Sequence, residues 1–210
     1  MTLARMHDFL RLRPGAPLIQ EGGAPGWVAL SLAQAPWVVV RRGEICNGII
    51  PVRVRGATTG RRFDSWVPVA AVSYRSTPED LAGRRSEPWH AAQAPALAAL
   101  ARVDPVLTRL GHSWGPLGSV AFELATNLPA ATPACDLDLV LRLEEPLTAC
   151  EARRLLRELV EAATPVRVDV LVETRLGSVH LGDLVLRHSR VLVKTANGIR
   201  LLTDPWSEAA

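Results

Sequence analysis

The sequence is short of several features, and each shortage excludes a class of protein. Cysteine occurs only three times in 210 residues, at Cys46, Cys135 and Cys150, with no CxxC pair. This excludes a disulfide framework or a thiolate zinc site and favours a reducing compartment. The nearest candidate for a membrane span, residues 28–40, contains a glutamine and a proline and is shorter than the ~18 residues required. We therefore expect a cytoplasmic protein without a membrane partner.

Lysine is almost absent, since 23 of the 24 basic residues are arginine and Lys194 is the single exception. The net charge of +3 is too small to indicate a nucleic-acid binder by itself. The charge is unevenly distributed, because residues 1–62 hold nine arginines against three acidic residues, whereas acidic residues predominate in the remainder. Guanidinium groups suit phosphate, so the arginine-rich segment is compatible with a small anionic ligand or with nucleic acid.

Proline and glycine mark the organisation of the chain. A composition of 48% hydrophobic and 21% charged residues is typical of a folded protein, and the length suits one large or two small domains. The proline-flanked segment 88–95 indicates a linker. We predict an α/β (α+β) protein with two lobes: a strand-rich, arginine-rich N-terminal lobe over residues 1–92 and a second domain over residues 93–210.

Hydrophobic periodicity predicts the elements of both parts. Residues 112–126 fit a strand, a turn or a short helix, and Thr148 begins a capping-box pattern. Pro105 predicts a break in the helix that contains it. The predicted strands are 37–40, 49–56, 61–69, 136–143 and 166–173, with a terminal hairpin over 191–202; the predicted helices are 27–34, 96–110, 148–163 and 178–187, and a short helix begins at Thr77.

Three aspartates form the most informative pattern. Residues two apart in a strand point to the same face, so Asp136 and Asp138 place two carboxylates close together. Like charges at that distance repel unless a cation bridges them, and Mg²⁺ prefers such oxygen ligands. Asp169 lies on the polar face of the next predicted strand, where it completes a second metal site. The alternative interpretation is a solvated strand edge.

A small-residue segment precedes the aspartates. Gly118 and Ser119 offer exposed amide groups and a hydroxyl, which suit the phosphates of a triphosphate. Together with the aspartates, they indicate phosphoryl or nucleotidyl transfer assisted by two Mg²⁺ ions.

The same residues carry a resemblance. Gly118-Ser119 with Asp136-Leu-Asp138 resembles the nucleotidyltransferase superfamily that includes polymerase β. More closely, the chain is similar to the holo-acyl-carrier-protein synthases of malonate decarboxylase, also called phosphoribosyl-dephospho-CoA transferases. The segments that carry this similarity are 37–42, 50–56, 114–126, 136–138 and 204–206.

The resemblance implies a fold, a reaction and its partners. It implies a polymerase-β-like domain with a mixed sheet flanked by helices, which uses Mg²⁺. The donor would be 2'-(5''-triphosphoribosyl)-3'-dephospho-CoA, the acceptor a serine of the acyl-carrier subunit of malonate decarboxylase, and the leaving group diphosphate. Asp136, Asp138 and Asp169 would be the catalytic metal ligands, and Gly118, Ser119 and Arg55 would bind the triphosphate. We expect no stable nucleic-acid partner.

The sequence leaves several alternatives open. The acceptor could be an antibiotic, an RNA end or another carrier protein, and a non-catalytic docking module of the decarboxylase is a further hypothesis. Asp169 is either a metal ligand or a base. Lys194 is interpreted as a surface residue or as one that approaches the active face, His112 as structural or as a proton carrier, and Glu123 as a brace for the loop or as an ordinary face carboxylate. No function is assigned to His180.

Overall fold

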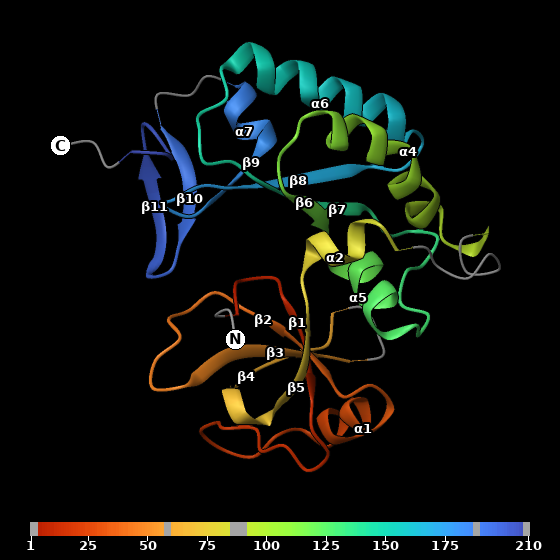
Figure 1. Cartoon of the computed structure of the whole chain (residues 1–210), viewed down its shortest axis with the longest axis vertical. Helices are drawn as coiled ribbons and strands as arrows, with labels where there is room; N and C mark the ends of the chain where they lie inside the picture. Colours follow the sequence, from red (N-terminus) through yellow and green to blue (C-terminus); the bar gives the residue numbers. More distant parts are fainter. Residues whose placement is uncertain (1–3, 57–59, 85–91, 187–189, 208–210) are drawn as a thin grey trace. The chain divides into compact units, whose positions relative to one another are not determined.

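The computed structural model describes residues 4–56, 60–84, 92–186 and 190–207. The chain forms two compact units, Met1–Thr77 and Pro78–Ala210 (Figure 1). Sequence reasoning instead placed the boundary between residues 92 and 93. Most of the predicted linker, residues 88–91, lies outside the described residues.

The earlier boundary follows from the contacts of helix α2 (Pro78–Ala82). Glu79 of α2 accepts a hydrogen bond from the Arg142 side chain of the second unit, with 2.5 Å between Oε1 and Nε. A Cβ added to Gly115 would lie 2.1 Å from the carbonyl oxygen of Pro78, so the two backbones touch there. Helix α2 therefore packs with the second unit.

The first unit is built on an antiparallel sheet of five strands in the order β4-β3-β2-β1-β5. The predicted hairpin is present, with Ile49 opposite Pro68 and Arg55 opposite Arg62; its turn residues 57–59 lie outside the described residues. Valine, leucine and isoleucine side chains of the strands form a core with Val28 of the helix. The elements are β1 (Phe9–Leu12), α1 (Gly26–Gln34), β2 (Trp37–Val40), β3 (Ile49–Arg55), β4 (Arg62–Pro68), a 3-10 turn (Val69–Ala71) and β5 (Val72–Ser76).

The second unit has a six-stranded mixed sheet in the order β11-β10-β9-β8-β7-β6. Strands β7 and β8 pair in parallel, which requires a crossover connection, and α6 (Ala149–Ala163) supplies it. The predicted capping box at Thr148 begins this helix. The strands are β6 (Trp114–Pro116), β7 (Leu137–Arg142), β8 (Val168–Glu173), β9 (Ser178–His180), β10 (Val191–Thr195) and β11 (Gly198–Leu202).

Helix α4 (Pro95–Arg109) lies beside α6 over the sheet of this unit (Figure 1). The predicted break at Asp104-Pro105 is wrong, because α4 continues through Pro105. A proline removes one backbone hydrogen bond from a helix, but here Val103 and Leu107 are completely buried on either side of it. Packing of the apolar face therefore keeps the helix continuous.

The segment after β8 also differs from prediction. The expected helix over 178–187 is instead strand β9 followed by the short helix α7 (Leu181–Val185), and residue 187 lies outside the described residues. Residues 112–126, whose sequence fits a strand, a turn or a short helix, include β6 and then helix α5 (Gly118–Thr126). Among the described residues, no helix is long and apolar enough to cross a membrane.

Candidate active site

Two of the three predicted aspartates meet on neighbouring strands. Asp138 of β7 and Asp169 of β8 are register partners in the parallel pair. Neighbouring strands lie about 4.8 Å apart, and partners in register point to the same face. Both side chains are partly exposed, whereas the residues that alternate with them in β8 are buried. The structure therefore places two carboxylates side by side on one face of the sheet.

The beginning of helix α5 adjoins the first of these carboxylates. The backbone N–H of Leu117 donates to the carbonyl oxygen of Asp138 at 2.8 Å. Gly118 follows with φ +62°, and a Cβ at this position would lie only 2.3 Å from Oδ2 of Asp138. Glycine is therefore favoured both by the left-handed backbone and by the close approach of the carboxylate.

Ser119 is the second residue of α5. The N–H of Ala121 donates to the carbonyl of Leu117, the residue before the helix, at 3.1 Å. Backbone amides at a helix N-terminus attract anions. The helix that begins at Gly118 and Ser119 therefore starts beside the Asp138 carboxylate.

The other predicted residues are placed differently. Asp136 precedes β7, and its Oδ2 lies 3.4 Å from Nη1 of the exposed Arg167. Arg55 lies on β3, in the first unit, whereas the other five predicted site residues belong to the second. His112 lies in an exposed turn after α4.

No three His, Cys, Asp or Glu side chains among the described residues are grouped to hold a metal by themselves. Mg²⁺, however, is usually bound through one or two carboxylates, with water and substrate phosphates as its other ligands. The oxygen ligands of Asp138 and Asp169 beside a glycine-lined helix start fit this kind of metal.

Sequence reasoning missed one residue at the site. His180 of β9 lies with Nδ1 3.0 Å from Oδ1 of Asp169, and its Nε2 lies 3.1 Å from Nζ of Lys194. Of the two interpretations of Lys194, the structure supports an approach to the carboxylate face. The sequence signal was the alternation of Ser178 and His180, which the predicted helix obscured.

Glu123 braces the loop that leads from α5 to the aspartates. Its side chain is 2% exposed, and Oε2 accepts hydrogen bonds from the N–H groups of Ala130 and Ala131 at 2.9 and 3.0 Å. A buried carboxylate is therefore used to fix loop backbone that no strand or helix holds.

We expect Glu123→Ala to lower the free energy of unfolding by roughly 3 kcal/mol, because hydrogen bonds to a charged acceptor are lost and a buried space is left. Chemical denaturation of the two proteins measures this change. The exposed Glu145 provides the control, since Glu145→Ala should leave the free energy nearly unchanged. An equal loss in both variants would contradict the bracing role.

The segment Asp204-Pro-Trp206 attaches the end of the chain to β7. The indole N–H of Trp206 donates to the carbonyl of Leu143 at 3.1 Å, just beyond that strand. Hydrogen bonds from the Ser207 hydroxyl and from the N–H of Trp206 hold the pKa of Asp204 below its usual value. This motif, which contributed to the family resemblance, has a structural role at the end of the strand that carries Asp138.

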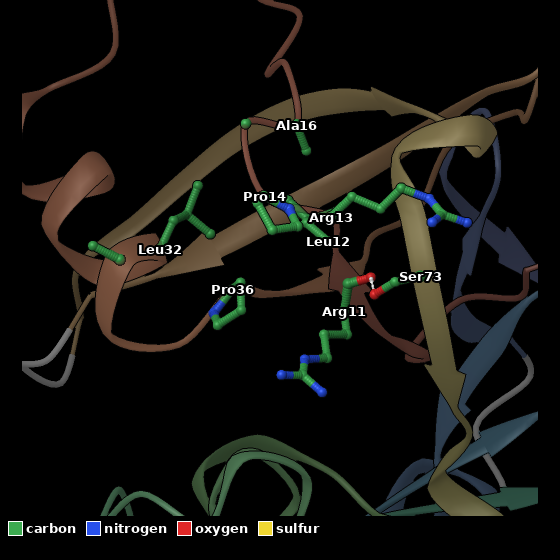
Figure 2. Close-up of a pocket in the computed structure, with 10 residues that line it drawn as sticks. Arg11, Leu12, Arg13, Pro14, Ala16, Leu32, Pro36 and Ser73 are labelled. Atoms are coloured by element: carbon green, nitrogen blue, oxygen red, sulfur yellow. Dashed lines mark hydrogen bonds between the residues drawn. The ribbon is translucent and has the colours of Figure 1, made fainter.

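A cavity of about 650 Å³ lies within the first unit (Figure 2). Arg11 and Arg13 contribute to its wall, with Leu32 and Pro36 opposite. The Ser73 hydroxyl donates to the Arg11 carbonyl at 3.0 Å, the bond drawn in Figure 2. None of the predicted site residues lines this cavity. The candidate active site is therefore defined by the carboxylates of the second unit.

Both units of the chain match models of one protein family. Residues 5–78 match the model of the phosphoribosyl-dephospho-CoA transferase MdcG N-terminal domain, and residues 81–205 match that of the C-terminal domain. The two matches meet where the structure divides into units. No solved structure matches significantly.

Curated relatives with the name phosphoribosyl-dephospho-CoA transferase are similar to this chain over nearly their whole length. The phosphoribosyl-dephospho-CoA transferase of Pseudomonas putida strain GB-1 is 38% identical over 207 residues, covering 99% of this chain and 97% of the relative. The one from Azotobacter vinelandii strain DJ is 39% identical over 191 residues, 90% and 89% of the two chains. The Pseudomonas syringae pv. tomato protein is 40% identical over 202 residues, which cover 95% of this chain and 92% of the relative. This chain therefore belongs to the phosphoribosyl-dephospho-CoA transferase family of enzymes.

Proposed function

We propose that this enzyme transfers the phosphoribosyl-dephospho-CoA group from 2'-(5''-triphosphoribosyl)-3'-dephospho-CoA to a serine of the acyl-carrier subunit of malonate decarboxylase. Family membership supports the transferred group. The observation that carries the chemistry is the register pairing of Asp138 with Asp169 beside the start of α5. The proposed site would therefore join a carboxylate pair to a phosphate-binding helix end.

In the proposed reaction, the serine oxygen forms a bond to the α-phosphorus of the donor triphosphate. The bond between that phosphorus and the oxygen bridging to the β-phosphate breaks, and diphosphate leaves with the electron pair. The serine proton passes to Asp169 or to water. Positioning and charge stabilisation dominate such transfers, because the protein forms no covalent bond with the substrate.

The proposal assigns a role to each predicted site residue. Asp138 and Asp169 would hold the metal, and Asp136 would join them as a ligand by giving up its contact with Arg167. When bound, two Mg²⁺ ions would offset phosphate charge and lower the pKa of the attacking hydroxyl. The amides of Gly118 and Ser119 bind the triphosphate oxygens. These roles, and that of Arg55 toward the donor phosphates, belong to the proposal.

Intact-mass spectrometry of the purified carrier subunit tests the function. With enzyme, donor and Mg²⁺, we expect the carrier to gain the mass of one phosphoribosyl-dephospho-CoA group. Replacing the acceptor serine with alanine should abolish the gain. If the enzyme instead transfers nucleotides to an RNA end or to an antibiotic and leaves the carrier unmodified, the proposed acceptor is wrong.

Removal of the metal is a separate test of the proposed Mg²⁺ requirement. Excess EDTA should lower the rate of carrier modification at least about a hundredfold, because the phosphate charge is then not offset. Adding Mg²⁺ in excess of the chelator should restore the rate, which the same mass measurement follows over time. Full activity in EDTA would contradict the metal proposal while leaving the acceptor proposal intact.

A further inference from the structure

A row of polar side chains crosses the sheet of the second unit toward the carboxylate pair. It runs from Lys194 on β10 through His180 on β9 to Asp169 on β8. The distances are 3.1 Å between Nζ and Nε2 and 3.0 Å between Nδ1 and Oδ1. All three residues are partly buried. Both distances are those of hydrogen bonds.

The strand register produces this row. His180 is opposite Leu171, two residues after Asp169, and Lys194 is opposite Ser178, two residues before His180. Diagonal neighbours on one face of an antiparallel pair lie within reach of long side chains. The row is thus fixed by backbone pairing rather than by a loop.

Gly177 allows the contact between Lys194 and His180. It has φ +151°, and a Cβ there would lie 2.4 Å from the backbone carbonyl oxygen of Lys194. Backbone at this position cannot move aside as a side chain can. The glycine therefore lets β10 approach the beginning of β9, which brings Lys194 within reach of His180.

The donor and acceptor capacities of the three side chains determine which group donates in each hydrogen bond. A lysine ammonium has three N–H donors and no acceptor, so Nε2 of His180 must accept from it. The proton of the neutral imidazole then lies on Nδ1, which donates to Oδ1 of Asp169. The ammonium therefore favours the tautomer that can donate to Asp169, and the position of the ring places this bond on Oδ1.

We propose that His180 and Lys194 are positioning residues for Asp169, an inference that rests on the proposed function of the carboxylates. His180 holds Oδ1, so Oδ2 is left for the metal or the attacking hydroxyl. Lys194 keeps the imidazole in the tautomer that can donate. Residues that orient a metal-binding group in this way typically affect affinity or activity about 10–100-fold.

Nitrogen-15 NMR of the full-length protein with labelled histidine tests the tautomer without metal or substrate. We expect His180 to show a protonated Nδ1 and an unprotonated Nε2, with the resonances identified by their loss in His180→Asn. Lys194→Met should remove the preference for this tautomer. A protonated Nε2 in the native protein, or a tautomer unaffected by Lys194→Met, would overturn the proposal.

Kinetics test the effect on the reaction. His180→Ala should lower kcat about 10–100-fold with little change in KM for the donor, because binding contacts are retained and only Asp169 loses its restraint. His180→Asn keeps an N–H donor near the Nδ1 position and should recover most of the rate. The exposed His112 gives the control His112→Asn, expected to have native rates.

If His180→Asn folds yet is as slow as His180→Ala, the positioning role is overturned. The NMR result does not depend on any acceptor. A native enzyme that leaves the carrier unmodified but shows the expected tautomer would therefore reject the proposed acceptor alone.

Discussion

Asp138→Asn is expected to lower the rate of carrier modification about a thousandfold, an increase in the activation barrier of roughly 4 kcal/mol. The substitution keeps the size of the side chain and one oxygen while removing its negative charge. Asp138 lies in register with Asp169 and against Gly118, so both the carboxylate pair and the helix start depend on it. The metal that binds the phosphate would lose one of its carboxylate ligands.

Single-turnover mass measurements with saturating donor give the rate without product release. The matched control is Glu161→Gln, which makes the same change of charge at an exposed position on α6 and should have no effect. Circular dichroism would check that both variants remain folded.

Thermal unfolding with and without Mg²⁺ gives a second readout. Like charges directly opposite one another on a sheet are destabilising, so removing the charge of Asp138 relieves a repulsion. Without metal, the variant should therefore lose at most about 1 kcal/mol of stability relative to the native protein. Mg²⁺ should raise the unfolding temperature of the native protein more than that of Asp138→Asn, since a ligand stabilises the state that binds it. Native activity in this variant would remove Asp138 from the mechanism.

The sequence predicted that Asp169 follows Asp138 on the polar face of the next strand along the chain, because two local rules agree. Alternation of valines with Asp169 defines the exposed face of β8, and the capping box at Thr148 predicts the helix between β7 and β8. A strand, a helix and a strand joined in this way favour parallel neighbours. The register that makes Asp138 and Asp169 partners is a finding of the structure, whereas the close pair expected from the sequence was Asp136 with Asp138.

The contribution of His180 could not be predicted, because it depends on pairing between strands. Taken alone, residues 178–187 have the spacing of a short helix, but β8 offers backbone groups that Ser178–His180 satisfy as a strand. The boundary between the two units, after Thr77, likewise depends on contacts between residues that are distant in sequence. Arg142 and Glu79 are 63 residues apart in sequence, and a proline-rich segment between them gave a stronger local signal.

Gly118→Ala is the second substitution with a large expected effect, because two separate constraints meet at this residue. A non-glycine residue at φ +62° costs about 1–2 kcal/mol, and the new methyl group would fall 2.3 Å from Oδ2 of Asp138. The carboxylate end can rotate away, so we expect a folded protein, less stable by about 1–2 kcal/mol, that transfers about a hundredfold more slowly. Denaturation and single-turnover measurements give the two quantities.

Gly182→Ala is the matched control. No atom lies within 4 Å of a Cβ placed at Gly182, and this residue of α7 has an ordinary φ. Alanine favours helix over glycine by about 1 kcal/mol, so the control should be at least as stable as the native protein and equally active.

The double variant Gly118→Ala, Asp138→Asn decides how the glycine acts. If the methyl group slows transfer by displacing the Asp138 carboxylate, it has little left to impair once that carboxylate is gone, and the double variant should be about as slow as Asp138→Asn alone. The stability loss from the left-handed backbone should persist in both backgrounds. If the fold-reductions in rate of the two single variants instead multiply, Gly118 acts mainly through its own approach to the phosphates, independently of Asp138. That result would contradict the coupling inferred from the contact between Gly118 and Asp138.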